Sequence, residues 1–424
     1  KVEIPIIDIF AGPGGLGEGF SSLIVPGSIK RAFKISLSIE KEYFAHKTLT
    51  LRSFYRQFPP GQVPPEYYDF VQDRITIDDL YKTYPKQATD AKKEAWKAQL
   101  GEDDKAVSNQ EVDQRISSTL NGTENWLLIG GPPCQAYSVV GRSRRRDKLL
   151  DEMKDARVGL YKQYLRILAV HNPAIFVMEN VKGLLSARTK SNSVFENIIK
   201  DLKNPVEAYN AEYGSSNISL NCPGYKIYSF VARSKSFDEN DSPIFNPEDF
   251  LIYSEKHGIP QTRHRVILLG IRNNIDIKEP GILPEEKEIG VQQVLNGLPK
   301  LRSGLTKIKD TQTNWTSTLK TIRKNGVLSK IDKDVGEEIR NHLQTVNNAP
   351  GSIGAEFIPF SVDTDYKPRW FLNKNLQGAC NHQSRGHMES DLLRYLFVSC
   401  FGKVRGRSPN LEDFPEELLP AHKN

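Results

Sequence analysis

Ile6-Ile-Asp-Ile-Phe-Ala-Gly-Pro-Gly-Gly-Leu-Gly17 is an apolar strand that runs into a glycine-rich turn and then a helix. Gly12, Gly14 and Gly17 match the spacing GxGxxG, in which glycines let the backbone turn tightly and approach a ligand closely. Glu40 lies 23 positions after Gly17, at the end of a second predicted strand. A carboxylate there could hold two ribose hydroxyls. These features favour a nucleotide-type ligand over a purely structural turn, without separating NAD from S-adenosylmethionine.

Strand-like and helix-like segments alternate along the first two thirds of the chain. Strands are predicted at 4–10, 33–39, 69–72, 126–130 and 174–178, and helices at 159–171 and 194–202. This alternation predicts an α/β fold, with a parallel sheet covered by helices on both faces. The polar segment 81–124 interrupts the rhythm and predicts a mostly helical insertion. A hairpin-like pair, 225–232 and 265–271, closes this part.

The pattern loosens beyond about Gly281, which predicts a second, smaller and irregular domain with one clear helix near 388–401. Lys and Arg number 58 against 52 Asp and Glu, a net charge of +6. Eight basic residues and one acidic residue fall within 300–330, so the basic excess is local. A local excess of this kind permits a polyanionic partner.

The composition excludes several classes of protein. With 38% hydrophobic and 26% charged residues, the chain is not a disordered tail. No apolar run approaches the ~18 residues that a membrane span needs. Four cysteines without a CxxC pair predict neither a disulfide framework nor structural zinc. The first residues show no signal-peptide pattern, so we expect a reduced, cytoplasmic setting.

A second motif, Gly130-Gly-Pro-Pro-Cys-Gln-Ala-Tyr-Ser138, follows the predicted strand 126–130. Cys134 is therefore expected at the carboxyl edge of the sheet, where open α/β folds bind their ligands. A buried cysteine is usually an inert, small hydrophobic side chain. A Pro-Pro-Cys sequence at a strand-to-loop junction, in the same sheet as a nucleotide loop, favours a nucleophile instead.

Together with the glycine-rich turn, this motif resembles the DNA cytosine-5 methyltransferase family, whose nucleophile lies in a Pro-Cys-Gln motif. Phe176-Val-Met-Glu-Asn-Val181 resembles the family's Glu-Asn-Val motif, and Gln261-Thr-Arg-His-Arg-Val-Ile267 resembles its Gln-x-Arg-x-Arg motif, in family order. The resemblance implies a Rossmann-like fold that uses S-adenosylmethionine. It also implies a catalytic domain at 1–280 and a DNA target-recognition region at 281–424.

The resemblance assigns roles to single residues. Cys134 would attack carbon 6 of cytosine, and Glu179 would hydrogen-bond or protonate ring nitrogen 3. Arg263 would reach the cytosine carbonyl, and Arg265 would support the site. The target base must be flipped out of the duplex to reach such a site. Phe10 would lie at the adenine or pack under the turn, and Asp73, after the third predicted strand, would lie near the adenine. Cofactor contacts are expected from Asp8, Phe10, Gly12, Gly14, Gly15, Leu16, Glu40, Asp73 and Pro132.

Residues 141–148 carry five positive charges and one negative charge. Such a run is usually a solvated surface, but its place directly after the nucleophile favours phosphate contacts. We expect DNA contacts from Gln135, Ser138, Arg142, Arg144, Arg145, Arg146, Lys307 and Arg385. His382 and His387, close to Arg385, could read bases, cap the helix that follows, or bind a metal. Without a matching third ligand we expect no metal.

The chain contains no Gly-Asn-Ala/Ser-Val element, which the family carries near its carboxyl end. If the protein lacks these motifs altogether, we expect weak cofactor binding by the chain alone, or a partner subunit that supplies them. Duplex DNA and a cognate restriction endonuclease are the other expected partners, in a bacterial, nucleoid-associated modification system. Three alternatives stay open: a tRNA cytosine-5 methyltransferase, a non-catalytic DNA-binding subunit, and a nicotinamide oxidoreductase, which would leave Cys134 unexplained.

Overall fold

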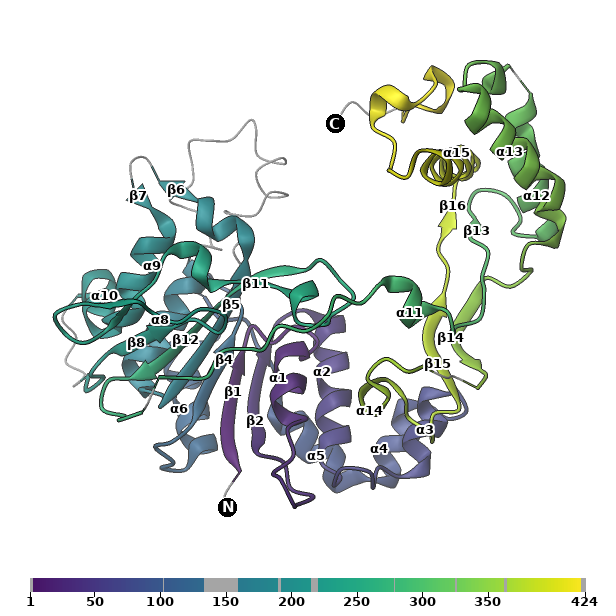
Figure 1. Cartoon of the computed structure of the whole chain (residues 1–424). Helices are drawn as coiled ribbons and strands as arrows, with labels where there is room; N and C mark the ends of the chain where they lie inside the picture. Colours follow the sequence, from purple (N-terminus) through teal and green to yellow (C-terminus); the bar gives the residue numbers. More distant parts are fainter. Residues whose placement is uncertain are drawn as a thin grey trace. The chain divides into compact units, whose positions relative to one another are not determined.

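The computed structural model describes residues 3–101, 103–132, 159–189, 192–214, 220–277, 279–324, 326–361 and 364–420. Its contacts divide the chain into two compact units. The first comprises residues 1–67 and 76–291, and the second comprises 68–75 and 292–424. Figure 1 shows the elements of both.

One sheet of eight strands forms the centre of the first unit (Figure 1). The strands are β1 (Ile4–Ile9), β2 (Phe33–Glu40), β3 (Ala95–Lys97), β4 (Leu127–Gly130), β5 (Ile175–Val181), β8 (Tyr225–Tyr228), β11 (Leu251–Tyr253) and β12 (His264–Arg272). Their order is β11-β12-β5-β4-β1-β2-β3, and β8 also pairs with β12. Strands β1 to β5 are parallel, whereas β12 runs antiparallel to β5, β8 and β11. This sheet confirms the predicted α/β class.

Helices cover both faces of the sheet. They are α1 (Gly15–Ser21), α2 (Tyr43–Arg56), α4 (Ile77–Thr83), α5 (Pro85–Glu94), α6 (Asn109–Leu120), α8 (Gly159–His171), α9 (Val194–Lys203) and α10 (Pro205–Tyr213). Successive strand residues point to opposite faces. Ile7 and Ile9 of β1 therefore belong to the core that includes α6, α8 and α9, while Ile6 belongs to a core packed by Leu16 and Phe20 of α1.

Several predicted elements are confirmed, but the third strand was placed wrongly. Residues 69–72 fall largely in helix α3 (Pro65–Val71), which has proline at its start and an acid in its first turn, both typical of helix beginnings. The strand beside β2 is β3, inside the segment predicted as a helical insertion. Three residues show no alternation of their own, so only their pairing with β2 makes them a strand. The segment 81–124 is thus part of the α/β core.

The predicted hairpin is confirmed by the antiparallel pairing of β8 with β12. On the other side of β12, Gly270 pairs with Phe176 of β5. A β-carbon at Gly270 would lie 2.0 Å from the Phe176 ring, which is fully buried between Tyr164 and Tyr225. The missing side chain at Gly270 therefore lets this aromatic cluster pack across the sheet.

Asp8 is a buried carboxyl group on β1. It is 1% exposed, and its Oδ2 atom has no hydrogen-bond partner among the described residues. That oxygen lies 3.0 Å from where a β-carbon at Gly17 of α1 would be. Burial raises the pKa of Asp8 to about 8, against the opposing charge of Arg56. Asp8 is therefore largely uncharged at neutral pH.

The second unit has a core of its own. With the junction before it, it contains α11 (Val291–Leu295), β13 (Gly304–Leu305), α12 (Gln312–Lys320), α13 (Lys333–Thr345), β14 (Gly354–Pro359), α14 (Pro368–Phe371), β15 (Gly378–Gln383), β16 (Gly386–His387) and α15 (Glu389–Arg405). Helix α15 confirms the helix predicted near 388–401. The expectation of an otherwise irregular region was wrong, because α12, α13 and α15 pack around a shared apolar core. Val335, Ile339 and Leu343, four residues apart, already carried the helical signal of α13.

No helix within the described ranges is long and apolar enough to cross a membrane.

Replacing Gly270 by alanine should destabilise the first unit by roughly 1–3 kcal/mol, because the new methyl group overlaps the Phe176 ring. Urea denaturation measures the change in the free energy of unfolding. Gly281→Ala is the matched control, since a β-carbon there meets no atom within 4 Å. Equal stability of the two variants would contradict this account of the aromatic cluster.

Asp8→Asn should flatten the pH dependence of stability. The folded-state pKa of about 8 lies above the ordinary 3.8, so the stability linked to the proton is fully present below about pH 4 and is lost as pH rises through about 8. The variant should therefore gain most over the wild type near pH 8 and least near pH 4. Thermal denaturation across this range measures the difference. Parallel curves for wild type and Asp8→Asn would refute the buried titration, and exposed Asp276→Asn serves as the control.

Candidate active site

A small cavity lies where the parallel strands of the first unit end. Its volume is about 110 Å³, and its lining residues are Phe10, Ile39, Glu40, Lys41, Ala98, Leu100, Gly131 and Leu160. They come from the ends of β1, β2, β3 and β4 and from the start of α8. The walls are mostly apolar, with one carboxylate among them. Open α/β sheets bind ligands at this edge.

Glu40 is fixed by two backbone hydrogen bonds. The N–H of Gly12 donates to its Oε2 at 2.8 Å, and the N–H of Glu42 donates to its Oε1 at 2.7 Å. The carboxylate therefore connects the end of β2 to the glycine-rich turn after β1. Each carboxylate oxygen can accept a further hydrogen bond, so both remain able to bind hydroxyl groups.

The turn after β1 holds a strained aromatic residue. Phe10 has a φ of 57°, a left-handed conformation that is uncommon for a bulky residue, and it lines the cavity. At Gly14, with a φ of 85°, a β-carbon would lie 2.8 Å from Leu49. Gly15 begins α1, and the side chain of Leu16 packs against the core. Asp8, expected to contact the cofactor, is buried and does not line the cavity.

Glu179 and Arg265 meet across two neighbouring strands. The antiparallel pairing of β5 with β12 brings Nε of Arg265 to 2.6 Å from Oε1 of Glu179. Arg265 also donates from Nη1 to the carbonyl oxygen of His264 at 2.8 Å. Both side chains stay partly exposed, at 31% for Glu179 and 23% for Arg265. An ion pair at the sheet edge is thus accessible to a ligand.

Gly131 and Asn180 connect this pair to the segment that leads to Cys134. A β-carbon at Gly131 would lie 2.9 Å from Oε2 of Glu179, so only glycine leaves room for the carboxylate. Asn180, 6% exposed, donates from Nδ2 to the carbonyl oxygen of Pro132 at 3.4 Å, and its Oδ1 accepts from the N–H of Val181. Cys134 lies outside the described residues, as do Gln135, Ser138, Arg142, Arg144, Arg145 and Arg146.

The two arginines of the Gln-x-Arg-x-Arg motif lie differently. Arg263 is exposed just before β12, where its carbonyl oxygen accepts from the Ser254 hydroxyl. It forms no ion pair with a described carboxylate. Arg265, for which only a supporting role was expected, is the arginine that contacts Glu179.

Asp73 does not follow a strand of the sheet. It lies in a left-handed conformation shortly after α3, in the segment grouped with the second unit, and it does not line the cavity. The expectation failed because the third strand is β3. Ala98 and Leu100, which follow β3, line the cavity instead. They are ordinary apolar residues, and only recognition of β3 could have found them.

Lys307 and Arg385 flank one pair of short strands in the second unit. Arg385 precedes β16 and Lys307 follows β13, so they lie at opposite ends of this parallel pair. His382 bonds to the carbonyl oxygen of Pro299, and the ring of His387 packs on Tyr395. The residue before α15 is Met388, without a side-chain capping bond, so neither histidine caps this helix.

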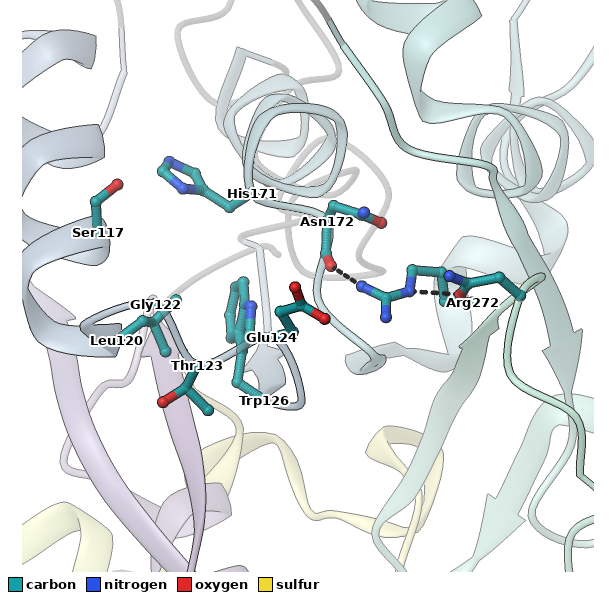
Figure 2. A pocket seen from close by; sticks show the side chains of 10 residues that line it. Ser117, Leu120, Gly122, Thr123, Glu124, Trp126, His171, Asn172 and Arg272 are labelled. Atoms are coloured by element: carbon teal, nitrogen blue, oxygen red, sulfur yellow. Dashed lines mark hydrogen bonds between the residues drawn. The ribbon is translucent and has the colours of Figure 1, made fainter.

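A larger pocket, shown in Figure 2, is lined mostly by residues that precede β4 and β5, at the edge where these parallel strands begin. It measures about 420 Å³, and its lining includes Trp126, His171, Asn172 and Arg272. Arg272 donates to the carbonyl oxygen of Asn172 and to Asn274, which closes this end of β12 onto the loop before β5. None of the predicted site residues lines this pocket. The smaller cavity, which is lined by the predicted site residues Phe10 and Glu40, is therefore the candidate active site.

Comparisons with known proteins point to one family. Residues 83–218 match the family model of the C-5 cytosine-specific DNA methylases. The chain is 31% identical over 318 residues to Type II methyltransferase M.Bpa9945I of Bacillus paralicheniformis, covering 70% of this chain and 61% of that protein. It is 25% identical over 304 residues to Type II methyltransferase M.DdeI of Desulfomicrobium norvegicum, covering 70% of this chain and 49% of that protein.

Among solved structures, the Entamoeba histolytica methyltransferase EhMeth matches 95% of this chain and 99% of its own, with 13% identity and a TM-score of 0.37. At that score the likeness adds nothing to the assignment. The chain spans less than two thirds of the length of the two curated relatives. The family model and these relatives, with the motifs in their order along the chain, support the resemblance of this chain to the C-5 cytosine-specific DNA methylase family.

Proposed function

We propose that the chain transfers a methyl group from S-adenosylmethionine to carbon 5 of a flipped-out cytosine in duplex DNA. One observation carries the proposal: Glu179, which is paired with Arg265, lies against Gly131, three residues before Cys134, and Gly131 and Glu40 line the same cavity. The candidate cofactor cavity and the charged pair therefore meet at the same strand end.

The lining residues of this cavity of about 110 Å³ suit the adenosine end of S-adenosylmethionine and not the whole cofactor. Phe10, Ile39 and Leu100 offer apolar walls to a flat adenine, and Glu40, held by two N–H groups, can accept from both ribose hydroxyls. The bound cofactor supplies an electrophilic methyl group. The residues of the chain orient it, with the glycine-rich turn at one wall and Gly131 at another.

The proposed chemistry begins with the Cys134 thiolate. Its sulfur forms a bond to carbon 6, and the electron pair of the 5,6 double bond moves into the ring toward nitrogen 3. Glu179 hydrogen-bonds or protonates that nitrogen. Arg265 pairs with Glu179 and orients it, and we assign to Arg265, in place of Arg263, the donation to the cytosine carbonyl. Carbon 5 is then electron-rich and accepts the methyl group, and S-adenosylhomocysteine is the leaving group. Loss of the carbon 5 proton to solvent re-forms the 5,6 double bond, and the carbon–sulfur bond breaks with its electron pair returning to Cys134 as the thiolate.

A stacked base exposes neither face to these residues, so the proposal includes base flipping. Two relatives are named Type II methyltransferases. We extend that role to this chain, with duplex DNA as substrate and a cognate endonuclease as the partner that a restriction-modification role implies.

Cys134→Ala should abolish methyl transfer to duplex DNA, because no sulfur remains to attack carbon 6. Binding of S-adenosylmethionine should stay near the wild-type value. Radiolabelled methyl transfer measures the first quantity and calorimetry the second. Retained turnover would remove Cys134 from the mechanism, and transfer to tRNA but not to duplex DNA would overturn the proposed substrate.

Glu40→Gln should weaken cofactor binding by roughly 10- to 100-fold, the effect of losing a hydrogen bond to a charged group. An amide has one acceptor oxygen, so it cannot serve the N–H groups of both Gly12 and Glu42 as the carboxylate does. Glu42→Gln is the matched control, because Glu42 accepts from Ala45 at the start of α2 and does not line the cavity. Equal cofactor affinity in the two variants would contradict the role of Glu40.

A further inference from the structure

Three cations of the basic segment 300–330 are already engaged. Arg302 pairs with Asp310, and Lys330 pairs with Glu417. Lys320 donates to the side-chain oxygen of Asn347 at 2.9 Å. The charge density seen in the sequence therefore overstates what this segment can offer to a ligand.

The cations that stay available include Arg323, which lines an open hollow in the second unit. The hollow measures about 520 Å³, and its lining residues are Arg323, Gly326, Leu328, Ser329, Arg340 and Gln344. Arg340 and Gln344 lie one turn apart on the same face of α13. Arg323 and Ser329 come from the short turns between α12 and α13. Two guanidinium groups thus line one hollow, and no carboxylate is among its described lining residues.

The walls of this hollow are anchored in the core of the second unit. Ile322, Ile339 and Leu343, each adjacent in sequence to a polar lining residue, are at most 2% exposed. Their burial fixes the backbone that carries Arg323, Arg340 and Gln344. The arrangement is therefore held by packing and does not require a ligand to form it.

Helix α13 carries acids that are paired with cations and, elsewhere on its surface, an arginine that is not paired with a described acid. Asp334 pairs with Arg405 and Glu338 pairs with Lys403, so cations of α15 neutralise its acids. Arg323 and Arg340 form no ion pair with any carboxylate in the described ranges. A guanidinium presents a planar fork of N–H donors that matches phosphate oxygens. Ser329 and Gln344 are the neutral polar residues among those that line the same hollow.

We propose that this hollow binds a backbone phosphate of DNA, through Arg323 and Arg340. The proposal rests on the proposed function in one respect, that the polyanion is DNA. The contact fixes the position of the second unit on the duplex and reads no base, since phosphate oxygens carry no sequence information.

The test is the salt dependence of duplex binding by the whole chain, measured by fluorescence anisotropy between about 50 and 200 mM salt. The slope of log affinity against log salt is negative, and Arg323→Gln/Arg340→Gln should make it shallower by about 0.9 or more, because at least one phosphate is no longer neutralised by the protein. Arg340→Gln alone should also make the slope shallower. Lys403→Gln/Arg407→Gln is the matched control, because it removes two exposed cations of the same unit that are paired with acids.

An unchanged slope in the Arg323/Arg340 variant, or an equal loss of steepness in the control variant, would overturn the inference. A loss of steepness measured with tRNA but not with duplex DNA would overturn DNA as the partner. Methyl transfer by the wild-type chain is measured on the same duplex. If the wild type transfers methyl groups and the double variant has an unchanged slope, only phosphate binding by the hollow is refuted. If the double variant has a shallower slope and the wild type transfers no methyl group, phosphate binding by the hollow is supported and the proposed function is refuted.

Discussion

The antiparallel pairing of β12 with β5 is the constraint on which the site depends. It places Arg265 beside Glu179, although the two residues are far apart in sequence. The aromatic cluster at Phe176, which needs the missing side chain of Gly270, packs on the same two strands three residues before Glu179. The core and the charged pair thus share one pair of strands.

Two glycines at the sheet edge stand where a β-carbon would overlap a neighbouring side chain. Gly131 leaves room for the Glu179 carboxylate, and Gly14 leaves room for Leu49. Phe10 is held in a left-handed conformation at the end of β1, at a conformational cost that the surrounding turn must offset. Glu40 then connects the turn to β2 through the Gly12 amide. The cavity is thus built by backbone constraints before any ligand binds.

The sequence predicted the strands and motifs that carry strong local signals. Apolar runs predicted β1, β2, β4 and β5, and the motifs predicted Glu40 and Glu179 as site residues, which the structure places at the end of β2 and near the end of β5. It failed where tertiary pairing decides: β3 is three residues long, so Asp73 was assigned to the site in place of the residues after β3. Counting charges along the sequence did not predict which cations are free to bind a ligand. Arg302 and Lys330 of the basic segment are paired with Asp310 and Glu417, whereas Arg340, outside that segment, lines the hollow.

Trapping with a duplex that carries 5-fluorocytosine tests the central claim most directly. Fluorine on carbon 5 cannot leave as the proton does, so the carbon–sulfur bond formed by attack on carbon 6 should persist after methyl transfer. The account predicts a covalent protein–DNA adduct that requires S-adenosylmethionine and maps to Cys134. An adduct at Cys222, Cys380 or Cys400, or no adduct from a chain that binds both duplex and cofactor, would contradict it.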